Sequence, residues 1–243
     1  MEQFKLYKLD KNDDITNIFF KNYKEISCDF SFNRNITYTD DKDEHQFSNY
    51  KHLNFHLLQP FLTKYFNPSD EIMSKVEFLK NKYKIDLDNT CGVFYRGNDK
   101  ITETIPPKYK QFIKKVRLFK KANPGIKFYL QTDEQELHNI FLEKFPKTIS
   151  ITEVPRINNS QTTVALQLKN DKNKMEVGKF FVASVYLISR MKNTICTSGN
   201  GEMWSSLFRG NANGVIQFLR PKKIIYGVPN SSYNPNQTNF WID

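Results

Sequence analysis

A chain of 243 residues with 39% hydrophobic and 26% charged residues has the size and composition of a globular protein with one large or two small domains. No run approaches the roughly 18 consecutive apolar residues of a membrane span, and no apolar signal core follows the N-terminus. The three cysteines are widely spaced, which predicts reduced thiols. We therefore expect a cytoplasmic protein. The net charge of +10 suits an anionic partner, although the abundance of Asn, Lys, Ile and Phe is equally typical of the AT-rich genome of a microbe or large virus.

The first 90 residues contain no glycine and predict a small α/β unit with long polar intervals. The expected elements are a helix at 15–26, a charged loop at 40–46 and a helical region at 47–83. Pro60 and Pro68 are expected to break or kink the helical region. We therefore assign residues 1–90 to a reduced N-terminal domain on the acceptor side of the molecule.

From Cys91 onward, short apolar runs alternate with helical patterns. The predicted strands lie at 91–95, 126–131, 148–153, 193–197 and 214–219. The predicted helices lie near 107–121, 133–145, 173–191 and 200–209. Strand–helix alternation of this kind predicts a parallel sheet that is covered on both faces. We therefore expect residues 91–243 to form a doubly wound, Rossmann-like domain that binds its ligand at the carboxyl ends of the strands.

Polar residues follow three of the predicted strands, at the edge where such a sheet binds ligands. They are Arg96-Gly97-Asn98-Asp99-Lys100 with Glu103, then Thr132-Asp133, and then Ser198-Gly199-Asn200-Gly201. The last group opens a helix, where backbone N–H groups and the helix dipole favour an anion such as phosphate. Each group also has a plainer interpretation, with Thr132, Ser198 or Asn200 as helix caps and Arg96 with Asp99 as a surface ion pair.

Three further motifs have simpler explanations than a catalytic site. Asp86-Leu87-Asp88 has the Asp-x-Asp spacing of metal-dependent sugar transferases, but it precedes a strand and so falls at the wrong edge of the sheet. His52 and His56 share a helix face but lack the adjoining glutamate of a zinc protease motif. The basic helix at 108–121 carries apolar residues at helical spacing, so its charges are most simply a solvated face. We therefore expect no metal site.

Three segments of the chain together resemble the signatures of the α1,6- and related fucosyltransferases. They are Val93-Phe-Tyr-Arg-Gly-Asn-Asp-Lys100, Phe128-Tyr-Leu-Gln-Thr-Asp-Glu134 and Cys196-Thr-Ser-Gly-Asn200. Their order and spacing agree with the family over residues 91–201. The resemblance implies a GT-B fold of two facing α/β domains, and an inverting transfer of fucose from GDP-fucose without an obligatory metal or other cofactor.

The resemblance also implies roles for individual residues. Arg96 takes the position of the arginine that binds the β-phosphate of the donor. Asn200 takes the position of a serine of the family's phosphate loop, and Lys100 that of the lysine in the first signature. The other nucleotide-sugar-binding candidates come from the strand ends, and they are Gly97, Thr132, Asp133, Ser198, Gly199 and Gly201. Asp99 and Glu103 are the candidates for the base that accepts the proton of the acceptor hydroxyl. Phe94 replaces the signature histidine, and Ser184 stands near a family aspartate, so two contacts to the guanine base are absent.

The predicted function is therefore a metal-independent glycosyltransferase that moves a sugar from a nucleotide donor to a glycan or other hydroxyl acceptor. Two alternatives stay open at this point. A nucleotide-sugar-binding protein without catalysis would fit the small N-terminal half, and transfer or hydrolysis assays would identify it. A basic nucleic-acid-binding domain would fit the net charge, and it predicts binding that weakens steeply with salt.

Overall fold

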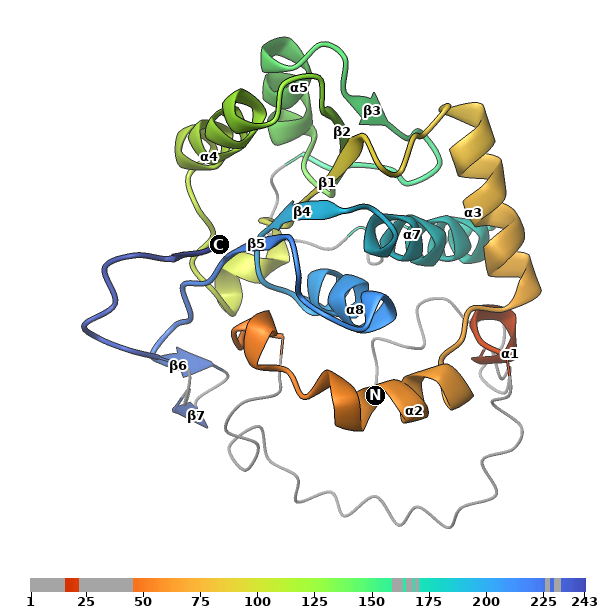
Figure 1. The fold of residues 1–243 in the computed structure, drawn as a ribbon, viewed down its shortest axis with the longest axis horizontal. Helices are drawn as coiled ribbons and strands as arrows, with labels where there is room; N and C mark the ends of the chain where they lie inside the picture. The colour runs from red at the N-terminus through yellow and green to blue at the C-terminus, as the bar shows by residue number, and fades with distance from the viewer. Residues whose placement is uncertain are drawn as a thin grey trace.

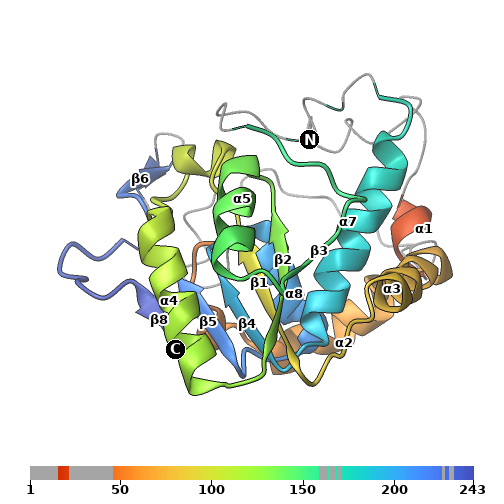
Figure 2. The same cartoon turned by 90° about the horizontal axis from the view of Figure 1, so that it is seen from above.

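The computed structural model describes residues 16–21, 46–158, 164, 168, 171–225, 228–229 and 233–243. Its centre is a six-stranded sheet with the order β3-β2-β1-β4-β5-β8 (Figure 1). The strands are β1 (Thr90–Tyr95), β2 (Lys127–Thr132), β3 (Ile149–Ser150), β4 (Asn193–Cys196), β5 (Val215–Phe218) and β8 (Trp241–Ile242). The first five run parallel, and β8 pairs antiparallel with β5. Figure 2 shows β3 and β8 at opposite ends of the sheet.

Helices cover both faces of the sheet, as expected for a doubly wound domain. Those of the doubly wound part are α4 (Tyr109–Ala122), α5 (Gln135–Lys144), α7 (Lys174–Ser189) and α8 (Asn200–Arg209), with the 3-10 helix η4 (Asp99–Thr102) after β1. Those that precede the sheet are α1 (Thr16–Phe19), the 3-10 helix η3 (Tyr50–His52), α2 (Phe55–Tyr65) and α3 (Asp70–Lys82). In Figure 1, α4 and α5 lie on one face, and α7 and α8 lie on the other. A small hairpin of β6 (Ile224–Ile225) and β7 (Val228–Pro229) stands apart from the sheet.

The central strand β1 is buried along its whole length, and its side chains alternate between two hydrophobic clusters. Cys91, Val93 and Tyr95 pack with α4 and α5, whereas Phe94 packs with α7 and α8. Gly92 also faces α7, where a Cβ would lie 2.8 Å from a methyl carbon of Ile188. Glycine at this position therefore lets α7 pack directly against the strand.

Two buried thiols lie on neighbouring strands but on opposite faces of the sheet. Cys91 of β1 belongs to the cluster under α4 and α5, and Cys196 of β4 belongs to the cluster under α7 and α8. Burial raises the pKa of Cys91 to about 12 and raises that of Cys196 well above its ordinary value. Both thiols are reduced, as the sequence predicts.

The described residues before the sheet pack into the same core as the sheet itself. Tyr50, Ile72 and Leu79 lie in one hydrophobic cluster with Phe94 and Leu187, and α3 packs along α7. The described part of 1–90 is thus continuous in packing with the face that α7 and α8 cover. The division of the chain at residue 90 stays a prediction.

Most of the expected elements are present, with three differences. The predicted helical region at 47–83 consists of η3, α2 and α3, and the gap that contains Pro68 separates the last two. Pro60 lies inside α2, which continues through it to Tyr65. The predicted strand at 148–153 is only two residues long at the sheet edge, and β6, β7 and β8 have no counterpart among the predicted elements. Of the predicted helix at 15–26 only 16–21 is described, and the charged loop at 40–46 lies outside the described residues except for Gln46.

Candidate functional site

From β1 the chain adds β2 and β3 on one side and then returns to add β4 and β5 on the other. The switch point of the sheet therefore lies between β1 and β4, which is where doubly wound sheets bind ligands. The segments that leave these two strands are joined by hydrogen bonds. The backbone N–H of Arg96 donates to Oγ1 of Thr197 over 3.0 Å, and the N–H of Thr197 donates to the carbonyl of Phe94 over 3.0 Å. These bonds hold the two segments side by side, with Arg96 following β1 and α8 following β4.

The side chain of Arg96 points toward the end of β2. Its Nε lies 3.6 Å from Oδ2 of Asp133, and the exposed fractions of the two side chains are 20% and 10%. Two of the three groups expected at this edge are therefore in contact. The hydroxyl of Thr132 accepts the N–H of Glu134 over 3.2 Å and so closes a turn after β2. Because the N-cap of α5 is Glu134, Thr132 is not the helix cap of its plainer interpretation.

The loop after β1 folds into η4 and holds a buried ion pair. Nζ of Lys100 lies 2.6 Å from Oε2 of Glu103, and both side chains are almost completely buried. Nζ of Lys100 also donates to Oε1 of Gln46 over 3.4 Å, which ties the loop to the segment before η3. The carbonyl of Gly97 accepts the N–H of Ile101 and so begins the turn. The side chain of Asp99 lies outside the described part of the structure.

The loop between β4 and α8 is partly occupied by other groups of the chain. The hydroxyl of Ser198 donates to the carbonyl of Phe218 and accepts Nε2 of Gln217, both over 2.8 Å. The N–H of Gly199 donates to the hydroxyl of Tyr50 over 3.0 Å. Within the described ranges, no hydrogen-bond acceptor meets the backbone N–H groups of Asn200 and Gly201. These two donors at the N-terminus of α8 are the ones left for an anion.

Glu202, which follows Gly201, is a carboxyl group of this site that is not among the predicted site residues. It is fully buried in the first turn of α8, and its Oε1 accepts the hydroxyl of Thr197 over 2.9 Å. Burial raises the pKa of Glu202, while the guanidinium of Arg96 opposes the shift. Thr197 thus connects the backbone of Arg96 to this acid. An acid in the first turn of a helix is common because the helix dipole favours it, so no feature of the local sequence distinguishes Glu202 from other such acids.

Tyr50 is a second residue of this edge that is not among the predicted site residues. Its side chain is fully buried, and besides accepting the N–H of Gly199 its hydroxyl lies 3.1 Å from the carbonyls of Gly199 and Gln46. The backbone N–H of Tyr50 donates to Oε1 of Gln217 over 3.0 Å, and Nε2 of Gln217 donates to the carbonyl of Ser48. Residues 46–50 therefore cover the carboxyl ends of β4 and β5 (Figure 1). No local pattern in the sequence predicts contacts between residues that are so far apart in the chain.

Glu134 is a third unselected residue, and it borders a cavity of about 340 Å³ beside the end of β1. Burial raises the pKa of Glu134 to about 7, and neighbouring Asp133 adds to the shift while the hydroxyl of Tyr109 opposes it. An acid that titrates near neutral pH in a cavity is a candidate functional group.

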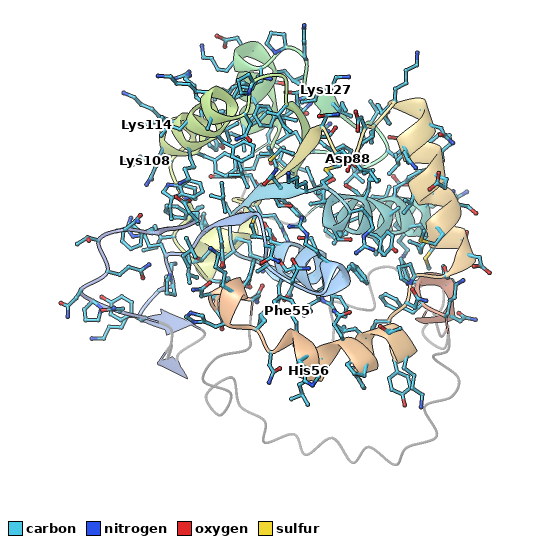
Figure 3. All side chains as sticks on the ribbon, in the orientation of Figure 1. Phe55, His56, Asp88, Lys108, Lys114 and Lys127 are labelled. Carbon is cyan, nitrogen blue, oxygen red and sulfur yellow. The ribbon has the colours of Figure 1, made fainter. Side chains whose placement is uncertain are left out.

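Other features lie away from this edge. A cavity of about 570 Å³ lies over α2, and its lining includes Phe55 and His56. Figure 3 shows this helix on the opposite side of the molecule from Lys108 and Lys114. Asp88 lies just before β1, at the amino edge of the sheet, as predicted. The described residues contain no cluster of acids, histidines and cysteines suited to a metal ion. None of the described helices has the length and hydropathy to span a bilayer.

No protein-family model and no curated protein matches this sequence. The chain is structurally similar to NodZ α-1,6-fucosyltransferase of Bradyrhizobium co-crystallized with GDP, with 15% identity over 63% of this chain and a TM-score of 0.40. It is also similar to a mutant of Arabidopsis thaliana FUT1 in complex with GDP, with 12% identity over 68% of this chain and a TM-score of 0.41. The chain spans less than half the length of these solved structures, 45% of the first and 36% of the second.

Proposed function

We propose that the chain is an inverting, metal-independent glycosyltransferase that binds a nucleotide sugar at the carboxyl edge of its sheet. The observation that carries the proposal is the junction of β1 and β4, where the backbone of Arg96 is hydrogen-bonded to Thr197 just before α8 and its guanidinium acts on the pKa of Glu202 in the first turn of α8. The resemblance of residues 91–201 to fucosyltransferase signatures favours GDP as the nucleotide and a fucose-like sugar. The acceptor is then a hydroxyl of a glycan or other molecule, and residues 1–90 are a reduced acceptor-side domain of a GT-B arrangement.

The chemistry of sugar transfer explains these residue types. The transition state resembles an oxocarbenium ion, and the departing diphosphate gathers negative charge. Arg96 suits this charge because its planar guanidinium binds phosphate oxygens in a bidentate manner and stays protonated. The N–H groups of Asn200 and Gly201 add fixed donors, each typically worth about 3 kcal/mol of the barrier.

Asp99 and Glu103 are the first candidates for the base that takes the acceptor proton. Glu103 already forms an ion pair with Lys100, so it must leave that partner before it can accept a proton. Replacement of each acid by its amide separates the two, because a base variant loses turnover while it keeps affinity for the donor.

Calorimetry with GDP and UDP tests the diphosphate site. We expect Arg96→Ala to weaken GDP binding roughly 10- to 100-fold, which corresponds to the loss of a charged hydrogen bond. Arg117→Ala is the matched control because Arg117 is exposed on α4 and forms no ion pair with a described residue. Equal GDP affinity for wild type and Arg96→Ala would rule the proposal out.

A chelator separates this reaction from a metal-dependent one. Arg96 and the opening of α8 supply positive charge without a metal, so EDTA should leave transfer unchanged. Loss of transfer in EDTA with recovery in manganese would contradict the proposed mechanism.

One observation favours a second, less preferred function on α4. This helix contains six basic residues and no acid, and Lys110, Lys114, Arg117 and Lys121 are exposed without an ion pair among the described residues. Such a face fits the phosphates of nucleic acid. A gel-shift series in rising salt tests it, with Arg117→Ala expected to weaken binding and Arg96→Ala serving as the control.

A further inference from the structure

The cavity beside β1 lies on the face of the sheet that α4 and α5 cover. Its apolar wall is formed by Tyr95, Ile101, Pro106, Pro107 and Tyr109. Gly97, directly after Arg96 in the chain, also lines it. The cavity therefore adjoins the proposed diphosphate site from the face of the sheet opposite α8.

Glu134 provides the buried acid of this cavity. The residue is only 3% exposed, and its Oε2 has no hydrogen-bond partner among the described residues. The carboxyl lies directly over Gly97, where a Cβ would overlap Oε1. Since buried polar atoms nearly always have a partner, this oxygen calls for a hydrogen-bond donor from a ligand.

The surroundings define the kind of donor. Lys108 and Glu136 also line the cavity, while Asp133 already interacts with Arg96, so the charges near the cavity do not favour an anion. The hydroxyl of Tyr95 donates to the carbonyl of Pro107, which leaves its ring and the prolines as an apolar surface. An apolar wall beside one buried carboxyl fits a sugar ring, which has C–H faces and hydroxyl edges.

We propose that this cavity holds the acceptor as a neutral, hydroxyl-bearing sugar ring and that Glu134, in place of Asp99 or Glu103, takes the proton of the attacking hydroxyl. The inference rests on the transfer reaction proposed above. The acceptor oxygen bonds to the anomeric carbon while the bond from that carbon to the diphosphate oxygen breaks, and its electron pair leaves with the diphosphate. The hydroxyl proton passes to the Glu134 carboxylate and then to water.

This assignment has a consequence for the pH dependence of transfer. Glu134 acts as a base only when deprotonated, so transfer rises with pH and levels off above the pKa of about 7. The titratable groups that face it are Tyr95 on β1, Tyr109 on α4, Lys108 before α4, and Asp133 and Glu136 beside it. Burial raises the pKa of both tyrosines above the working range, so neither produces this midpoint.

The test uses the full chain, GDP-fucose and the methyl glycosides of galactose, glucose and N-acetylglucosamine. Transfer is measured between about pH 5.5 and 8.5, glycoside binding by saturation-transfer NMR, and GDP affinity by calorimetry on the same samples. The variants are Glu134→Gln, Ile101→Trp to fill the cavity, and the control Glu143→Gln on the exposed end of α5.

We expect Glu134→Gln to lower transfer about 100-fold or more and to remove the rise near pH 7, while GDP affinity stays within about threefold. Ile101→Trp should abolish saturation transfer to the glycosides, and Glu143→Gln should change nothing. The inference is overturned if the wild type binds no glycoside or transfers to none, or if Glu134→Gln keeps the wild-type rate and pH profile. Failure of the proposed function appears separately, as absence of GDP binding by the wild type.

Discussion

Replacement of Tyr50 by phenylalanine removes one oxygen atom from the carboxyl edge of the sheet and keeps the ring. That oxygen accepts the N–H of Gly199 over 3.0 Å and lies 3.1 Å from two carbonyl oxygens. Tyr50 and Gly199 are both buried, so water has little access to the donor that loses its partner. The substitution therefore isolates the hydrogen bonds that join residues 46–50 to the loop before α8.

The expected cost follows from this geometry. A buried N–H left without a partner costs about 1–3 kcal/mol, and the retained ring leaves no large void, so we expect a loss of about 2 kcal/mol in the free energy of unfolding. For a chain of 243 residues this lowers Tm by roughly 4–8 °C.

Urea unfolding followed by intrinsic fluorescence and circular dichroism measures the change. Tyr233→Phe is the control, because Tyr233 is exposed and should shift the free energy by less than about 0.5 kcal/mol. GDP affinity should stay the same in Tyr50→Phe if the diphosphate uses Asn200 and Gly201, whose N–H groups the substitution does not touch. An unfolding free energy equal to that of the wild type would refute the claim that this hydroxyl stabilises the loop.

Three further predictions concern other parts of the fold. The folded state keeps the proton of Glu134 up to about pH 7, whereas the unfolded chain loses it near pH 4.5, so the free energy of unfolding falls as pH rises between these values. Glu134→Gln should remove that fall. In urea titrations this variant should have a free energy of unfolding up to about 3 kcal/mol above that of the wild type at pH 8 and equal to it at pH 4. Arg209 donates hydrogen bonds to four backbone carbonyls. Arg209→Met should therefore lower the free energy of unfolding by about 2–4 kcal/mol, as measured by urea midpoints. The control Arg190→Met, at an exposed position, should lower it by less than about 1 kcal/mol. Gly214 has φ +69° and a Cβ there would lie 2.5 Å from a backbone carbonyl, so Gly214→Ala should lower Tm more than Gly125→Ala, where φ is +89° but the space is open; equal shifts in calorimetry would contradict the steric argument.

The sheet was predictable from sequence because its strands are short, continuous apolar runs with helical periodicity between them. Burial on both faces imposes that pattern on β1, β2, β4 and β5 locally, so no tertiary information is needed. The two-residue strand β8 carries no such pattern, because its pairing with Gln217 and Phe218 depends on where the C-terminal segment returns. Edge pairings of this kind follow from the assembled sheet.

The candidate site was predictable only in part. Arg96 and Asp133 were expected at one edge because both follow strands of a parallel sheet, and the structure brings them together. Glu134 and Glu202 were not selected, because what distinguishes them is burial without full hydrogen bonding, a property of the packed chain. The contact between Tyr50 and Gly199 joins residues far apart in sequence, and no periodicity encodes it.

The two buried thiols lie on opposite faces of the sheet, so their labelling by a thiol reagent can report local unfolding on each face separately. A thiol reagent attacks the thiolate, so neither Cys91 nor Cys196 reacts until its face is exposed and its pKa falls back to the ordinary range. With Cys28 replaced by serine, the labelling rate of single-cysteine variants reports separately on detachment of α4 and α5 and on detachment of α7 and α8. Equal rates mean that both layers leave the sheet in one cooperative step, whereas faster labelling at one thiol identifies the layer that opens first.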